Sequence, residues 1–204
     1  MSKMLVTVAG LAIAAAASAS NPGSVSGQGG SIPDNGGGSG NLFSSSVSAG
    51  ANIVITGVSF QGLSHTWVGD LSMTLTGPGA GNSFNFFYRP GQTSATGFGQ
   101  SGDFSAANAY SFSDGGAAWN TTTATVPSGN YAPIRSAFAP AQAINSFAGL
   151  NGSAAGTWTL TIGDNAAADT GSLTGWTLNY KVVPTPGAAA LMGVAGLAGL
   201  RRRR

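Results

Sequence analysis

The sequence of 204 residues contains no cysteine, no glutamate and only one histidine, and charged residues make up only 7% of it. Without cysteine no disulfide framework can form, so the stability of a folded domain must come from its core or from a metal. Without glutamate, hydrolysis by a pair of carboxylates would have to use two of the six aspartates. These shortages argue against a secreted metal-dependent hydrolase, which is kept only as an alternative.

Basic residues are also scarce outside the ends of the chain. The formal net charge of +2 includes eight basic residues, but Lys3 and the four arginines at 201–204 belong to terminal segments. The remainder has three basic residues, Arg89, Arg135 and Lys181, against six aspartates, which gives it a net charge of −3. Nucleic-acid binding requires basic residues spread over a folded face, so this class of partner is excluded.

Glycine is abundant instead, with 33 residues, accompanied by many Ser, Thr and Asn residues and by scattered aromatic residues. This composition suits short strands joined by tight turns. Residues 71–76 alternate strictly between apolar and hydroxyl side chains, as in a strand with one buried face. The other candidate strands lie at 53–60, 84–88, 110–112, 123–126, 157–162 and 176–180. The sequence therefore predicts an all-β domain of the β-sandwich or jelly-roll class.

The N-terminus has the three parts of a secretory signal peptide. Lys3 supplies a positive charge, residues 5–17 form an apolar stretch too short to span a bilayer, and Ala17-Ser18-Ala19 offers small residues for cleavage. We therefore expect signal peptidase to remove residues 1–19. Residues 20–50 are rich in glycine and serine and are interpreted as a leader, which places the folded domain at 51–183.

The C-terminus, residues 184–204, also has three parts. A proline-containing motif comes first, the apolar segment 187–200 follows, and a run of arginines ends the chain. The residues of the motif and of the run are Pro184, Thr185, Pro186, Arg201, Arg202, Arg203 and Arg204. Because a basic cluster after an apolar helix stays in the cytoplasm, the domain would lie on the outer side of the membrane.

This tail resembles the PEP-CTERM sorting signal of Gram-negative bacteria, with Thr185 where the family has glutamate. The resemblance implies that an exosortase-type membrane transpeptidase cleaves the chain near the proline motif. Residues 187–200 would then anchor the protein in the inner membrane only transiently, and the domain would reach the cell surface or an exopolysaccharide matrix. The alternative is a permanent tail anchor, a short hydrophobic helix that is never removed.

The predicted domain resembles the P domain (P/Homo B) of the proprotein convertases. Residues 65–75 look like its early motif, and residues 156–160, 164–166, 169–171 and 176–178 match its last strands in order. The resemblance implies an eight-stranded β jelly roll.

A P domain usually follows a subtilisin-type protease and stabilises it. Here only residues 20–50 separate the predicted cleavage site from the first predicted strand, which is far too short for a protease domain. The resemblance therefore implies the fold and not the peptidase activity. A further alternative is an accessory P domain for a separately encoded protease.

His65, the only histidine, is the obvious candidate for a catalytic base, with Asp70 five residues further on. A catalytic triad also requires an exposed nucleophile on a strained turn, and no Gly-x-Ser-x-Gly elbow is present. We therefore expect His65 to form a hydrogen bond or a loop contact beside the strand that starts at Asp70.

Asp164 and Asp169 flank a predicted turn, and Asp70 could join them if the end of its strand lies nearby. Carboxylate oxygens around such a loop suit Ca²⁺. The alternative is that these aspartates are turn residues whose side chains accept hydrogen bonds from local backbone amides. Both interpretations stay open at this point.

Four tryptophans could stack on sugar rings or could fill the core. Trp158 and Trp176 alternate in phase with aliphatic residues and are expected in the core. Trp67 and Trp119 lie beside turn or loop residues and are candidate contacts for a glycan. The expected function is that of an exported, non-catalytic structural or binding protein of the cell surface, with a surface polysaccharide as a candidate partner.

Overall fold

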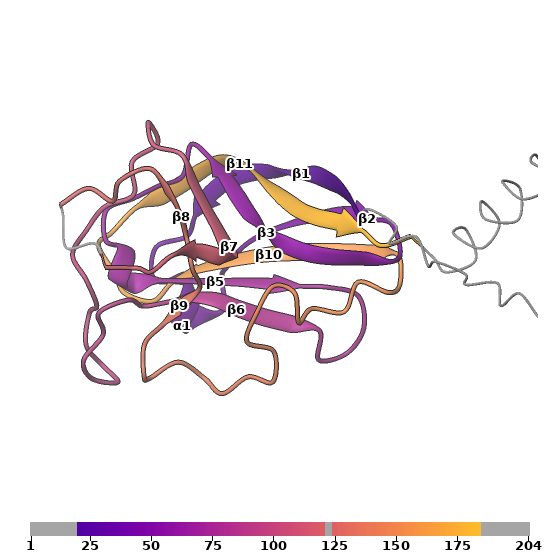
Figure 1. The fold of residues 1–204 in the computed structure, drawn as a ribbon. Helices are drawn as coiled ribbons and strands as arrows, with labels where there is room; N and C mark the ends of the chain where they lie inside the picture. The colour runs from indigo at the N-terminus through magenta and orange to yellow at the C-terminus, as the bar shows by residue number, and fades with distance from the viewer. Residues whose placement is uncertain (1–19, 121–123, 185–204) are drawn as a thin grey trace, which may run out of the picture. The chain divides into compact units, whose positions relative to one another are not determined.

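Two β-sheets form a sandwich in the computed structural model, which describes residues 20–120 and 124–184 (Figure 1). Sheet A has the strand order β1-β11-β3-β7-β8, with β4 also paired to β11, and sheet B has the order β2-β10-β5-β6-β9. The strands are β1 Asn21–Ile32, β2 Phe43–Ala49, β3 Ile53–Gln61, β4 Ser64–His65, β5 Leu71–Thr76, β6 Ser83–Tyr88, β7 Tyr110–Ala117, β8 Gly129–Tyr131, β9 Ile134–Arg135, β10 Gly156–Asp164 and β11 Gly171–Val182. The predicted all-β sandwich is confirmed.

Helical structure in the described residues amounts to one turn, α1 (Gly36–Ser39), and a 3₁₀ turn at Val68–Asp70. Among residues 20–120 and 124–184, no helix is long and apolar enough to cross a membrane. The apolar segments that the sequence predicts at 5–17 and 187–200 lie outside the described residues.

The strands with clear alternation occur where the sequence predicts them. Strand β5 covers the predicted residues, and its apolar side chains Leu71, Met73 and Leu75 are fully buried. The predicted strand at 123–126 is only partly within the described residues. In its described part, residues 124–126, only an isolated bridge joins Thr125 to Asp103.

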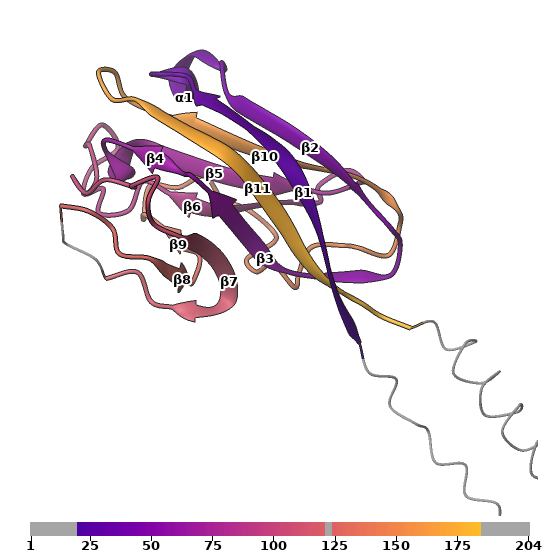
Figure 2. The same cartoon turned by 90° about the horizontal axis from the view of Figure 1, so that it is seen from above.

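The folded domain begins about 30 residues earlier than residue 51, the start that the sequence predicts. Residues 20–50, interpreted as a leader, contain β1 and β2, so one strand is added to each sheet. Strand β1 pairs with β11 from Asn21↔Val182 to Ile32↔Gly171, and Figures 1 and 2 show the two strands side by side. Strand β2 pairs with β10 over seven residues.

Glycines let β1 fit against the aromatic residues of its partner strand. Gly23 lies opposite Tyr180 and Gly27 opposite Trp176. A Cβ atom would come within 2.4 Å of the Tyr180 ring at Gly23 and within 2.2 Å of the Trp176 indole at Gly27. The aromatic rings of β11 therefore occupy the space that side chains of β1 would otherwise fill.

The core between the sheets is rich in aromatic residues. Trp158 and Trp176 are fully buried, as predicted, and the indole N–H of Trp176 donates to the hydroxyl of Ser45 at 2.9 Å. The phenylalanines Phe86, Phe87, Phe112 and Phe147 are also fully buried, and Phe86 and Phe87 both pack against Phe112. Each such ring contributes about 1.5–3 kcal/mol by burial, which replaces the disulfides that the chain lacks.

Candidate functional site

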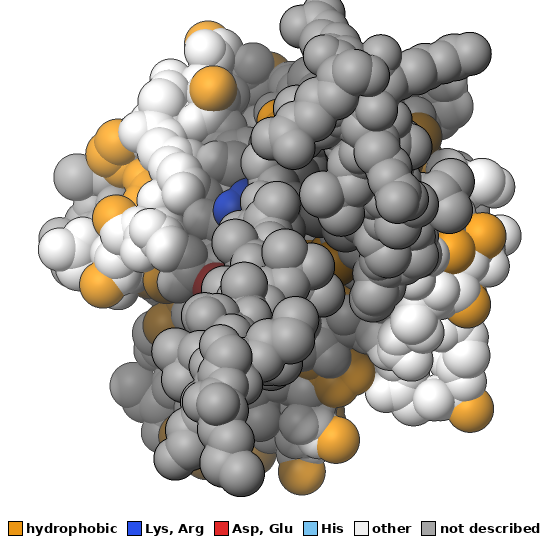
Figure 3. Space-filling view, turned by 45° about the vertical axis from the view of Figure 1, so that its right-hand side comes forward, with side chains coloured by type: hydrophobic (Ala, Val, Ile, Leu, Met, Phe, Trp, Pro, Cys, Tyr) orange, Lys and Arg blue, Asp and Glu red, His pale blue; other side chains and the backbone are white. Residues whose placement is uncertain are grey.

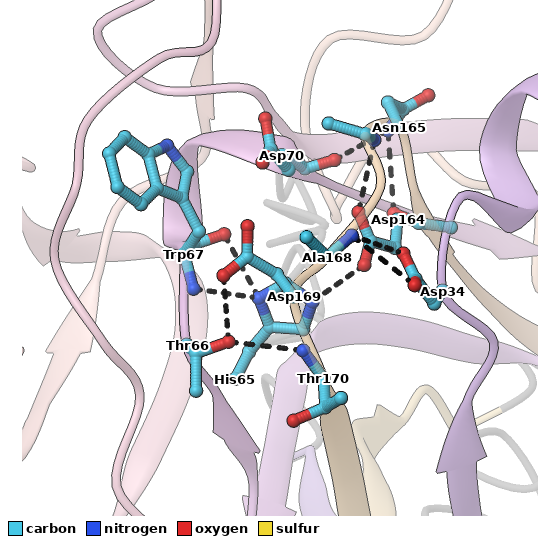
Figure 4. Close-up of polar contacts among 12 residues, drawn as sticks. Asp34, His65, Thr66, Trp67, Asp70, Asp164, Asn165, Ala168, Asp169 and Thr170 are labelled. Atoms are coloured by element: carbon cyan, nitrogen blue, oxygen red, sulfur yellow. Dashed lines mark hydrogen bonds and ion pairs between the residues drawn. The ribbon is translucent and has the colours of Figure 1, made fainter.

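Four ionisable side chains from separate strand ends are buried together at one end of the sandwich. We call His65, Asp70, Arg89 and Asp164 the buried polar end (Figure 4 shows three of them). Strand β5 is antiparallel to both β10 and β6. The start of β5 therefore lies beside the ends of β10 and β6, which brings three of these residues to the same end of sheet B. Asp164 ends β10, Asp70 directly precedes β5, and Arg89 directly follows β6.

Both ring nitrogens of His65 are engaged, and the residue is only 1% exposed. Nε2 lies 3.1 Å from Oδ2 of Asp164. Nδ1 lies 3.1 Å from the amide nitrogen of Trp67 and 2.9 Å from its carbonyl oxygen. The ring nitrogen can therefore accept from the amide when it carries no proton and donate to the carbonyl when it does. When Nδ1 carries no proton, the proton of the neutral ring lies on Nε2, which then donates to Asp164.

Gly171 makes room for the imidazole. His65 pairs with Gly171 across β4 and β11, and a Cβ atom there would lie 2.4 Å from Cδ2 of the ring. Since any side chain at this position would collide with the ring, the glycine keeps His65 in place against the end of β11.

Asp164 accepts hydrogen bonds at both carboxylate oxygens. Oδ2 faces His65, and Oδ1 accepts from the amide of Ala166 at 3.1 Å. Burial raises the pKa of Asp164, and the hydrogen bond from Ala166 and the proximity of His65 lower it by less. The next residue, Asn165, donates from its side chain to the carbonyl of Asp70 at 2.7 Å, which ties the end of β10 to the start of β5.

Asp70 is held by Arg89 rather than by the histidine. The guanidinium donates to Oδ1 of Asp70 at 3.3 Å and to the carbonyl of Gly97 at 2.8 Å. Burial raises the pKa of Asp70, Arg89 lowers it by less, and the nearby Asp164 and Asp169 raise it further. The two buried carboxylates are therefore close enough to influence each other.

Two more aspartates lie at the rim of this end. Oδ1 of Asp169 accepts from the hydroxyl of Thr66 at 2.9 Å, and the same hydroxyl accepts from the amide of Thr170 (Figure 4). Oδ1 of Asp34 accepts from the amide of Ala168 at 3.1 Å. Both aspartates therefore fix the β10–β11 turn to other parts of the chain.

The arrangement does not match a catalytic triad. The nitrogens of His65 are directed at Trp67 and Asp164, not at a serine hydroxyl, and Asp70 is bonded to Arg89. A base must be exposed to the reacting group to remove its proton. The prediction that His65 forms a hydrogen bond or loop contact is confirmed.

Calcium at Asp70, Asp164 and Asp169 stays a prediction. The three residues do lie at one end of the domain, but each carboxylate faces a partner of its own, namely Arg89, His65 and Thr66. Within residues 20–120 and 124–184, no three His, Cys, Asp or Glu side chains converge as metal ligands do. Because Ca²⁺ takes six to eight oxygen ligands, it would have to displace some of these partners.

The two candidate glycan-contact tryptophans are both partly buried. Trp119 packs against Phe87 and Tyr131 with ring centroids 5.1 and 5.0 Å apart, and its indole N–H donates to Gln100 at 3.0 Å. The indole N–H of Trp67 is buried and has no hydrogen-bond partner. Trp119 is therefore partly buried and packs against the aromatic core, and a glycan contact at Trp67 and Trp119 stays a prediction.

Sequence reasoning missed Arg89 and Asp34, and the aspartate that it weighed beside His65 was Asp70, not Asp164. His65 and Asp164 are 99 residues apart, so no local motif connects them. One signal was available. In a chain with so few charges, an arginine directly after an aromatic strand is a candidate partner for a buried carboxylate.

A comparison with curated proteins found no match. Residues 135–180 match the family model of the proprotein convertase P-domain. The matched segment includes the last residue of β9, all of β10 and most of β11, together with Asp164, Asp169 and both fully buried tryptophans. In this segment, which the sequence resemblance also covers, the chain is similar to the P-domain family.

Proposed function

We propose that this protein is an exported, non-catalytic structural or binding module of the cell surface or its polysaccharide matrix. The observation that carries the proposal is that the side chains of the buried polar end are buried from solvent and bonded to each other or to nearby backbone. His65, Asp70 and Asp164 are at most 1% exposed and are bonded to neighbours within the chain. These are the residues that sequence reasoning would select for chemistry, and their contacts support a role in stability.

Delivery would use both ends of the chain. Signal peptidase would cleave after Ala19, and an exosortase-type transpeptidase would cleave near Pro184 and Pro186. The pairing of Asn21 with Val182 supports cleavage at these two places, because both lie just outside the paired strands at the ends of the folded domain. Segment 187–200 would hold the protein at the inner membrane until cleavage.

Export and processing can be tested by mass spectrometry of the protein from the envelope and extracellular fractions of its host. A mass that begins at Ser20 and ends near Pro184 is expected. The variant Pro184→Ala/Pro186→Ala serves as the control and should accumulate with its tail intact in the membrane fraction. A wild-type protein that keeps residues 187–204 would contradict removal of the tail and favour a permanent anchor.

The second candidate is an accessory P domain for a separately encoded subtilisin-like protease. The family match at residues 135–180 favours it. The test is the inactivation half-life of a secreted subtilisin-like protease from the same host, with and without this protein. A longer half-life in its presence would favour the accessory role, and an unchanged half-life would leave the surface module as the better proposal.

A further inference from the structure

The outer face of sheet A is almost entirely composed of uncharged polar side chains. Strand pairing aligns one row of such residues across the whole sheet. The row is Ser26, Thr177, Ser59, Ser111 and Asn130. Figure 3, drawn from a different side, shows hydrophobic side chains (orange) interspersed with uncharged polar groups and backbone (white) where the described residues are visible.

A shallow hollow of about 700 Å³ lies on this face, over strands β1, β11, β3, β7 and β8. Its polar lining includes Ser59, Ser111, Ser113, Asn130 and Asn179, and apolar groups of Pro22, Val54 and Tyr180 also line it. Neighbouring strands are about 4.8 Å apart, so five strands span about 19 Å. We call it the sheet A groove.

The polar groups of the groove are ordered by one another. Asn130 accepts from Ser111 at 3.2 Å and donates to Ser113 at 2.8 Å. Asn179 donates to Ser59 at 2.8 Å. Each amide has two N–H donors and an oxygen with two lone pairs, so these bonds orient the amides without using all their capacity. Polar groups that are oriented in advance lose little entropy when they bind a ligand.

The small number of charged side chains in the groove and the net negative charge of the domain favour an uncharged ligand. The lining contains two ionisable side chains that lie on the solvent side, Asp114 and Lys181. Asp114 is already engaged, since its two oxygens accept from the amides of Phe147 and Ala148 at 2.8 and 2.9 Å. With three basic residues against six aspartates between the two terminal segments, the domain would repel an anionic polymer.

The centre of the groove offers no free backbone edge to a peptide strand. At Gly57–Phe60, strand β3 pairs with both β11 and β7, so the sheet occupies its N–H and C=O groups there. At this centre a ligand must bind through the side chains, which are mainly hydroxyl and amide groups, with Val54, Tyr180 and Lys181 also in the lining. We infer that the sheet A groove binds an uncharged polysaccharide chain. This inference rests on the proposed role as a binding module and specifies its ligand class.

The test is affinity gel electrophoresis of the purified protein in gels that contain dextran, laminarin or galactomannan, with alginate as the anionic comparison. Retardation by at least one neutral polymer is expected, and it should persist at high salt because no charge pair is involved. The variant Asn130→Ala/Asn179→Ala should bind at least about tenfold more weakly, since two hydrogen-bonding side chains are lost.

The matched control is Ser46→Ala/Thr159→Ala, which removes a hydrogen-bonded polar pair from the outer face of sheet B. This variant should be retarded like the wild type. Failure of every neutral polymer to retard the folded protein would overturn the inference, as would stronger retardation by alginate or an unchanged affinity of the asparagine variant. Since export and tail removal are measured by mass, failure of this binding test is distinguishable from failure of the proposed delivery.

Discussion

At the buried polar end, four ionisable side chains are withdrawn from water and bonded to partners within the chain, whereas the outer face of sheet A presents uncharged hydroxyl and amide groups to solvent. The first region contains the only histidine and two of the six aspartates. The second is composed of residue types that are abundant throughout the sequence. The rarest chemical groups are therefore structural, and the commonest ones form the surface that a partner can reach.

The difference shows why residue type alone is a poor guide to function in a chain with little charge. A buried carboxylate is tolerated only when hydrogen bonds and an opposite charge compensate for its loss of water. Asp164 and Asp70 satisfy this condition through His65 and Arg89. Exposed Ser, Thr and Asn side chains require no such compensation, so they can vary in arrangement and serve recognition.

The largest expected effect comes from Asp164→Ala. The substitution leaves the His65 ring and the amide of Ala166 without their partner in a buried site, which should lower the free energy of unfolding by about 3–5 kcal/mol. Urea denaturation measures this change. Asp34→Ala is the control, because its exposed carboxylate accepts from one amide and its removal should cost about 1 kcal/mol or less. Equal losses for the two variants would contradict a special role for the buried pair.

Gly27→Ala tests whether β1 belongs to the sandwich. Because the new methyl group would meet the Trp176 indole, the free energy of unfolding should fall by about 1–3 kcal/mol. Gly115→Ala, a strand glycine with open space around it, is the control and should not destabilise the protein. If both variants unfold at the wild-type urea concentration, β1 is not packed against β11 as described.

The pH dependence of stability should reveal the buried carboxylates. Asp70 has a pKa above 3.8 in the folded protein because of burial, so its contribution to stability is present below pH 3.8 and is lost as pH rises through the folded pKa. As the pH rises through this range, the free energy of unfolding of the wild type should therefore fall relative to that of Asp70→Asn. Urea midpoints from pH 3 to pH 7 measure it, and a difference that moves in the opposite direction would contradict the assignment.

Calcium should have the smallest effect. Because Asp70, Asp164 and Asp169 already have partners, a chelator should leave the Tm unchanged, and added Ca²⁺ should not raise it. Differential scanning calorimetry in the two conditions makes the comparison. A Tm that rises with Ca²⁺ in the wild type but not in Asp169→Asn would support the predicted calcium site.

The sequence predicts the strands in which apolar and hydroxyl side chains alternate, such as β5, because period-two alternation directly reports one buried face. It could not reveal β1, where Gly23 and Gly27 occupy inward positions and the apolar groups are supplied by Tyr180 and Trp176 of another strand. The pair of His65 with Asp164 is similarly hidden, since tertiary pairing of β4, β10 and β11 creates it.

The most direct test of the account measures the free energy of unfolding and polysaccharide retardation on the same three proteins: wild type, His65→Gln and Asn130→Ala/Asn179→Ala. The account predicts that His65→Gln is less stable but, while folded by near-UV circular dichroism, is retarded like the wild type. The asparagine variant should keep nearly all of its stability and lose retardation. A folded His65→Gln protein that no longer binds, or an asparagine variant that still does, would contradict the division between a structural end and a binding face.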